Sequence, residues 1–120
     1  MAKAKKPPDL CERAYAYSLR AVKLYQALQR HKDGAALIIG EQYLRQATAV
    51  GALLELAAAS LTRAEIANHH AAARQQARAS LYWLHVLAAS GLVESSRLAA
   101  ITQETEEIVA LLEKTTGAKK

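Results

Sequence analysis

Three observations predict an all-α protein folded as an antiparallel up-and-down four-helix bundle. The chain has 120 residues with 27 Ala but only five Gly and two Pro, a composition that favours closely packed helices over a sheet. Apolar residues recur at steps of three and four along four segments of about 20 residues each, as on one face of a helix. The connections between these segments are short, and short connections join antiparallel neighbours in a bundle.

The first helix is expected over about 10–32, after a disordered basic tail of residues 1–8. Asp9 can cap this helix, and Glu12 three residues later completes a capping box. Gly34 is expected to end it in the left-handed conformation that glycine favours at helix C-termini. The apolar stripe of this helix runs through Leu10, Ala14, Tyr17, Ala21, Leu24 and Leu28.

The second helix is expected over about 36–59. Its stripe contains two glycines, which predict a close approach by the backbone of a neighbouring helix. We expect the buried stripe to consist of Leu37, Gly40, Leu44, Ala47, Gly51, Leu54 and Ala58.

The third helix is expected over about 63–90, opened by a capping box of Thr62 with Glu65 and closed by Gly91. Its buried side reads Ile66, Ala73, Ala77, Leu84 and Leu87, with Trp83 alongside. The fourth helix is expected over about 96–115, and the bundle then spans 9–116, followed by a short basic tail of residues 117–120. The stripe of the fourth helix is Leu98, Ile101, Thr105, Ile108 and Leu112.

The first two helices carry more apolar residues than one stripe needs. A bundle helix exposes about half of its circumference, and surplus apolar surface is typical of a protein that binds a partner subunit. The sequence therefore predicts self-association. The surplus residues are Tyr15, Leu19 and Val22 in the first helix and Ile39, Tyr43, Val50 and Leu53 in the second.

Composition also excludes several classes of protein. A single cysteine, Cys11, excludes an internal disulfide and a cysteine-based zinc site. No apolar run approaches the roughly 18 residues that cross a bilayer, and no signal peptide is visible. We expect a soluble, cytoplasmic protein without a membrane partner.

The net charge is +5, with a sequence pI of about 9.5, and the basic residues fall into two rows. At about 100° per residue, each row occupies an arc of roughly 80–100° on its helix. Such rows suit salt-sensitive contact with the phosphate backbone of RNA or DNA. The basic row of the third helix comprises Arg63, His70, Arg74, Arg78 and His85. The basic row of the first helix comprises Arg13, Arg20, Lys23 and Arg30.

Two other interpretations of the basic rows stay open. Each row could be a solubilising face, or it could pair across a subunit interface with the acidic fourth helix. That helix carries Glu104, Glu106, Glu107 and Glu113.

Candidate catalytic chemistry is sparse. Arg63 with His69, and Arg78 with His85, match the spacing of helical ribonuclease domains of the HEPN type, but Arg and His are frequent enough here for chance matches. Glu65 and His69 lack the further carboxylates of a ferritin-like metal site. We therefore expect no enzyme activity, no catalytic residues, no metal site and no cofactor.

Two segments resemble a bacterial four-helix-bundle family. One is the run of residues 41–52 with Ala57 and Ala58, and the other is the Ala-rich basic run of residues 73–84, which ends in Tyr82-Trp83-Leu84. Ser90-Gly91-Leu92 also fits, and the resemblance covers about residues 10–115. The family comprises proteins encoded in ribosomal-RNA intervening sequences and the related accessory variability determinant (Avd) proteins of diversity-generating retroelements.

The resemblance implies a ring-like homo-oligomer, often a homopentamer, without catalytic residues. In the Avd branch it further implies a partnership with a reverse transcriptase and its template RNA. In the intervening-sequence branch, the alternative is a structural or adaptor oligomer that does not bind RNA.

The chain departs from the intervening-sequence pattern at four positions. Leu53 and Leu56 stand where that branch has Asn and Glu, and Gln76 and Ala79 stand where it has acidic residues. These departures predict the loss of a buried polar network and favour the Avd branch.

Overall fold

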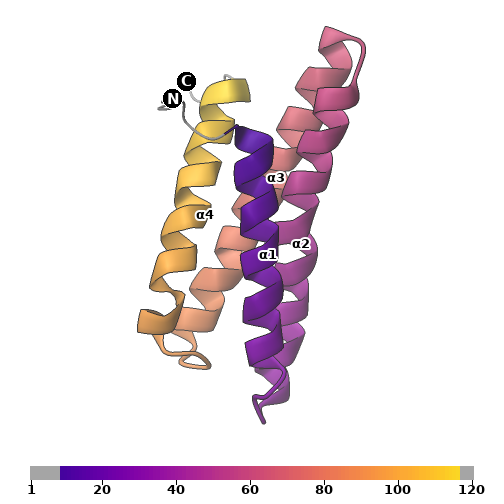
Figure 1. Ribbon diagram of the computed structural model, residues 1–120. Helices are drawn as coiled ribbons and strands as arrows, with labels where there is room; N and C mark the ends of the chain where they lie inside the picture. Colours follow the sequence, from indigo (N-terminus) through magenta and orange to yellow (C-terminus); the bar gives the residue numbers. More distant parts are fainter. Residues whose placement is uncertain (1–8, 117–120) are drawn as a thin grey trace, which may run out of the picture.

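The predicted four-helix bundle is confirmed. A computed structural model describes residues 9–116 as four helices: α1 (Leu10–Leu28), α2 (Gly34–Ala59), α3 (Arg63–Ala89) and α4 (Ser95–Thr116). Each helix runs antiparallel to the one before it (Figure 1). α1 and α3 each contact both α2 and α4, and the α1–α4 pairing is the sparsest of the four. The two predicted tails, residues 1–8 and 117–120, lie outside the described residues.

The two ends of the bundle differ. The end with the α2–α3 connection, residues 60–62, is called the tip; the end with the other two connections, residues 29–33 and 90–94, is called the base. At the tip, α2 and α3 extend beyond the start of α1 and the end of α4 (Figure 1). Within residues 9–116, no helix combines the length and the apolar character that crossing a membrane requires.

The first helix is shorter than predicted, ending at Leu28 rather than at residue 32. Gly34 does not end it, but is the first residue of α2, because the Asp33 side chain accepts a hydrogen bond from the Ala35 N–H at 2.9 Å and caps α2 instead. Gly91, with φ of 78°, adopts the left-handed conformation after α3 as expected. The other helix ends agree with the prediction to within two residues.

Side-chain capping starts α1 and α3 as predicted. Asp9 accepts from the Cys11 N–H at 3.4 Å, and Thr62 accepts from the Glu65 N–H at 3.1 Å. The Glu65 carboxylate in turn accepts from the N–H of Leu61, at 3.3 Å, rather than from that of Thr62. Each cap satisfies a backbone donor that the first helical turn leaves free.

The core contains the predicted stripes of α1 and α4, but that of α2 is rotated. All five stripe residues of α4 are buried, and four of the six in α1. In α2, Tyr43 and Val50 are completely buried, although they were predicted to lie among the surplus apolar residues outside the buried stripe. Ala58, which was predicted to lie in that stripe, is exposed. The surplus on α1 is exposed as expected, since Tyr15, Leu19 and Val22 expose 64%, 50% and 39% of their surface.

The two glycines of α2 differ in how closely a neighbour approaches. A Cβ atom at Gly40 would lie 2.6 Å from Cδ1 of Leu28 in α1, too close for an unchanged side chain. A Cβ atom at Gly51 would lie 3.5 Å from the carbonyl oxygen of Ala14, an ordinary van der Waals distance. The backbone approach predicted from the glycines is therefore found at Gly51, whereas the close neighbour at Gly40 is a side chain.

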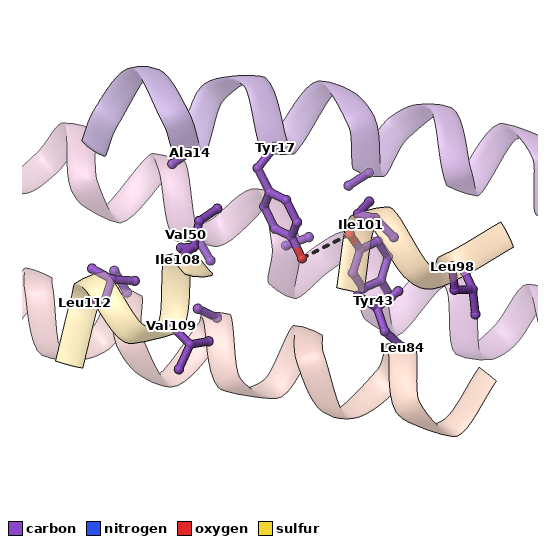
Figure 2. Packing of buried hydrophobic residues seen from close by; sticks show 14 of the residues in the cluster. Ala14, Tyr17, Tyr43, Val50, Leu84, Leu98, Ile101, Ile108, Val109 and Leu112 are labelled. Carbon is purple, nitrogen blue, oxygen red and sulfur yellow. Dashed lines mark hydrogen bonds between the residues drawn. The ribbon is translucent and has the colours of Figure 1, made fainter. Parts of the chain in front are cut away.

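Four hydroxyl groups, one from each helix, meet in the middle of the core. The Tyr17 hydroxyl lies 2.7 Å from Oγ1 of Thr105, 3.2 Å from Oγ of Ser80 and 3.1 Å from the Tyr43 hydroxyl, which donates to it. Figure 2 shows the two tyrosine rings with their hydroxyls directed at each other. Their rings meet edge to face, with centroids 6.4 Å apart. All four residues are at most 1% exposed, so Tyr17 is the hub of a dry polar network.

Every hydroxyl proton in this network has an acceptor. Thr105 can donate to the Ile101 carbonyl at 2.7 Å and Ser80 to the Ala77 carbonyl at 2.8 Å, which leaves Tyr17 to donate to Thr105. Burial raises the pKa of both Tyr17 and Tyr43 above the ordinary tyrosine value, so both phenols stay neutral. The sequence predicts that Leu56 stands where a buried polar group would otherwise lie. Leu56 is 52% exposed and does not belong to the core, so this part of the prediction is wrong.

Candidate nucleic-acid interface

The two predicted basic rows lie on diagonal helices, and both border α4. Arg13 begins the α1 row (Arg13, Arg20, Lys23, Arg30) and reaches carboxylates of α4. Arg78 of the α3 row (Arg63, His70, Arg74, Arg78, His85) reaches a third α4 carboxylate. The rows therefore flank α4 from its two sides and do not merge into one basic surface.

Arg13 is held by a fork of charged hydrogen bonds. Its Nε and NH2 groups donate to the two oxygens of Glu104, each at 3.0 Å, and NH2 also donates to Glu107. The hydrogen bonds with Glu104, more than those with Glu107, raise the pKa of Arg13. The pKa of Glu107 is lowered first by the amide of Gln103 and then by Arg13. Arg13 thus joins α1 to α4 and is not free to bind phosphate.

The middle of the α3 row is also engaged. NH1 of Arg78 donates to Glu113 at 2.5 Å, while 58% of the Arg78 side chain stays exposed. Arg74, one turn earlier, is half-buried, and its Nε is buried without a hydrogen-bond partner. The sequence left open that the basic rows pair with the acidic fourth helix of a neighbouring subunit. For Arg13 and Arg78 this pairing occurs within one chain.

The remaining row residues are more available. Arg20, Lys23 and Arg30 are exposed and make no ion pair with any other described residue. On α3, Arg63 and His85 are exposed and His70 is partly buried. Because α1 ends at Leu28, Arg30 lies in the base connection and not on the helix as predicted. The unpaired charge therefore concentrates on the base half of α1 and in the connection after it.

One exposed arginine near these residues belongs to neither predicted row. Arg97 lies in the first turn of α4, at the base of the bundle. No other basic residue of α4 lies near it, so it forms no row of basic residues along that helix. Its spacing of seven residues from Glu104 places both on one side of α4, a signal that the sequence did contain.

The described residues offer no obvious metal centre. Within residues 9–116, no three His, Cys, Asp or Glu side chains come together as a metal site would require. Cys11 donates to the Leu54 carbonyl at 3.6 Å, and burial, more than the nearby carboxylates, raises the pKa of its thiol. The raised pKa keeps this thiol in its weakly nucleophilic protonated form.

Comparison with known proteins finds a similar solved structure. The chain resembles the crystal structure of a protein of unknown function from the S23 ribosomal protein family of Bacteroides thetaiotaomicron, with a TM-score of 0.82 and 24% sequence identity. The match covers 90% of this chain and 98% of that one. No family model and no curated protein matches the sequence. At this identity the similarity establishes the fold, a compact four-helix arrangement, and nothing about activity.

Proposed function

We propose that this protein is a non-catalytic homo-oligomer that binds the phosphate backbone of RNA or DNA. The observation that carries the proposal is the exposed, unpaired row formed by Arg20 and Lys23 on α1 and by Arg30 in the connection that follows it. A nucleic acid presents several phosphates to a row of this kind.

Binding of this kind is driven by charge and is largely independent of sequence. Cationic side chains displace counterions from the backbone, so affinity falls steeply as salt rises. The exposed aromatic side chain nearest in sequence, Tyr15, lies on the α2 side of α1, where it lines a groove with Ser18 and Gly51. It is therefore not interleaved with the basic row, as stacking on bases would require.

Self-association is supported by apolar side chains left on the surface. Tyr15, Leu19 and Val22 form an exposed stripe on α1, which borders the basic row because Leu19 lies one turn from Lys23. Leu56 on α2 and Tyr82 on α3 also expose more than half of their surface. Contiguous apolar surface of this kind is typical of an interface between subunits.

The sequence resemblance supports a finer proposal. We propose an accessory role of the Avd type, in which a ring-like oligomer, such as a homopentamer, partners a reverse transcriptase and its template RNA. The basic row would then face the RNA, and the apolar stripe would face the neighbouring subunit.

The alternative is an adaptor or structural oligomer of the intervening-sequence type that binds no RNA. The pairing of Arg13 and Arg78 with α4 favours this alternative, because it shows that part of the basic surface serves the fold. The two functions differ in salt dependence, since a packed oligomer interface lacks the steep slope of phosphate binding.

Fluorescence anisotropy with a labelled oligouridine, titrated over a series of KCl concentrations, tests the proposal. The triple change Arg20→Gln, Lys23→Gln and Arg30→Gln should weaken binding at least about tenfold at low salt and flatten the salt dependence, because each lost phosphate contact removes about 0.7 from the slope. Arg45→Gln, at an exposed and unpaired site on α2, is the control. Equal affinity of the triple variant and the wild type would remove the basis of the proposal.

A further inference from the structure

The seam between α1 and α4 changes character along its length. Toward the tip, Arg13 of α1 faces Glu104 of α4 in a two-pronged ion pair. Seven residues are two helical turns, which return to the same side of a helix within about 20°. Stepping toward the base, Arg13 is followed by Arg20 on α1, and Glu104 is followed by Arg97 on the antiparallel α4. The oppositely charged Arg13 and Glu104 are thus followed, two turns closer to the base, by Arg20 and Arg97, which carry the same charge.

The antiparallel register brings a third cation to the same level. The Tyr17–Thr105 and Arg13–Glu104 contacts fix the alignment of the two helices, and continuing it toward the base places Lys23 level with Arg97. Lys23 lies one turn after Arg20, about 60° further around α1 on its solvent side. All three side chains are exposed, and none makes an ion pair with another described residue.

Arg20 also has an effect on the core. Burial raises the pKa of Tyr17 and Tyr43, and the positive charge of Arg20 opposes that rise at both residues. Arg20 is therefore the cation whose charge acts on the hydroxyl network. Figure 1 shows α1 and α4 spreading apart toward the base, so Arg20 and Arg97 project from two separated helices.

Like charges that face each other across a seam repel, and a bound anion converts that repulsion into attraction. A phosphate suits guanidinium groups, which bind its oxygens in pairs. A single phosphate would use the seam alone, but the unpaired charge continues past the end of α1 to Arg30 in the base connection. Such an extended row of charge fits a chain of phosphates.

We propose that Arg20, Lys23 and Arg97 form a phosphate-binding site across the base half of the α1–α4 seam, which holds the backbone of a bound nucleic acid. The site rests on the proposed function and deepens it, because it assigns the bound strand to one seam and adds Arg97 from a second helix. The strand then continues past the end of α1 toward Arg30.

The test compares Arg97→Glu with Arg45→Glu. Both arginines are exposed and unpaired, and both substitutions change the net charge equally, but Arg45 lies on α2, away from the seam. Binding of labelled oligouridine at low salt should weaken at least about tenfold for Arg97→Glu and less than about threefold for Arg45→Glu. The salt slope should fall by about 0.7 more for Arg97→Glu than for the control.

Thermal unfolding supplies an independent readout. The substituted carboxylate at position 97 would face Arg20 as an opposite charge and would lie in the first turn of α4, where acidic side chains are favourable. Arg97→Glu should therefore unfold at the same temperature as the wild type or at a higher one, while losing affinity. A lower unfolding temperature would contradict the like-charge arrangement.

The remaining outcomes separate the site from the general function. Equal weakening by the two substitutions would overturn the seam site while leaving nucleic-acid binding intact. Failure of the wild type to bind oligouridine at low salt would overturn the proposed function itself. Displacement of the RNA by inorganic phosphate at millimolar concentration, or binding to phosphatidylserine vesicles as tightly as to RNA, would show that the seam holds isolated phosphate groups and would also overturn the proposal.

Discussion

The hydroxyl network predicts an unusual pattern of stabilities when its hub is removed. Tyr17→Phe keeps the ring and creates almost no cavity, but it deletes the hydroxyl that contacts Tyr43, Ser80 and Thr105. Ser80 and Thr105 keep their own backbone acceptors, the carbonyls of Ala77 and Ile101. The Tyr43 hydroxyl alone is left buried without an acceptor.

The magnitude follows from these contacts. An orphaned buried hydroxyl costs about 1–3 kcal/mol, and the lost hydrogen bond to Thr105 costs about 0.5–1.5 kcal/mol. Tyr17→Phe should therefore lower the free energy of unfolding by about 2–4 kcal/mol. Adding Tyr43→Phe removes the orphaned group, so the double variant should be at least about 1 kcal/mol more stable than Tyr17→Phe alone.

Urea unfolding followed by far-ultraviolet circular dichroism measures all three variants. Protein concentration has to be the same throughout, because self-association contributes to apparent stability. A positive coupling energy between the two substitutions is expected, as for residues that share one network. A double variant whose loss equals the sum of the two single losses would refute the assignment of Tyr17 as the hub.

Two further predictions concern stability. Burial raises the pKa of Tyr17 and Tyr43 in the folded state, so the unfolded chain loses these protons first as pH rises. The free energy of unfolding should therefore be steady below about pH 10 and fall above it. Urea midpoints between about pH 8 and 11 check this, and the Tyr17→Phe/Tyr43→Phe variant should show a shallower fall. Gly51→Ala should raise the free energy of unfolding by up to about 1 kcal/mol, because the added methyl meets only ordinary contacts and alanine favours a helix. A clear loss of stability in the same urea titration would show that Gly51 is needed for packing.

Periodicity predicted the helices well and the rotation of α2 poorly. In α4 the apolar residues occupy a single stripe, so Ile101, Ile108 and Leu112 could only face the core. α2 carries apolar residues on most of its circumference, and a stripe through Leu44 and a stripe through Tyr43 fit the spacing equally well. Packing against α1 and α3 decides between them, and that information is not local.

The basic rows show the same limit. Spacing along one helix groups Arg13 with Arg20 and Lys23, but it does not say which neighbouring helix each of them faces. Glu104 pairs with Arg13 across 91 positions of sequence, so only the tertiary arrangement separates the paired cations from the free ones. The hydroxyl network could not be predicted for the same reason, since its four members lie on four helices.

Light scattering on a sizing column, with and without a structured RNA at low and at high salt, tests the central claim most directly. A self-associating backbone binder should elute as one discrete oligomer, gain mass with RNA at low salt and return to its own mass at high salt. A monomer of 13.0 kDa, or an oligomer whose mass RNA never changes, would contradict it.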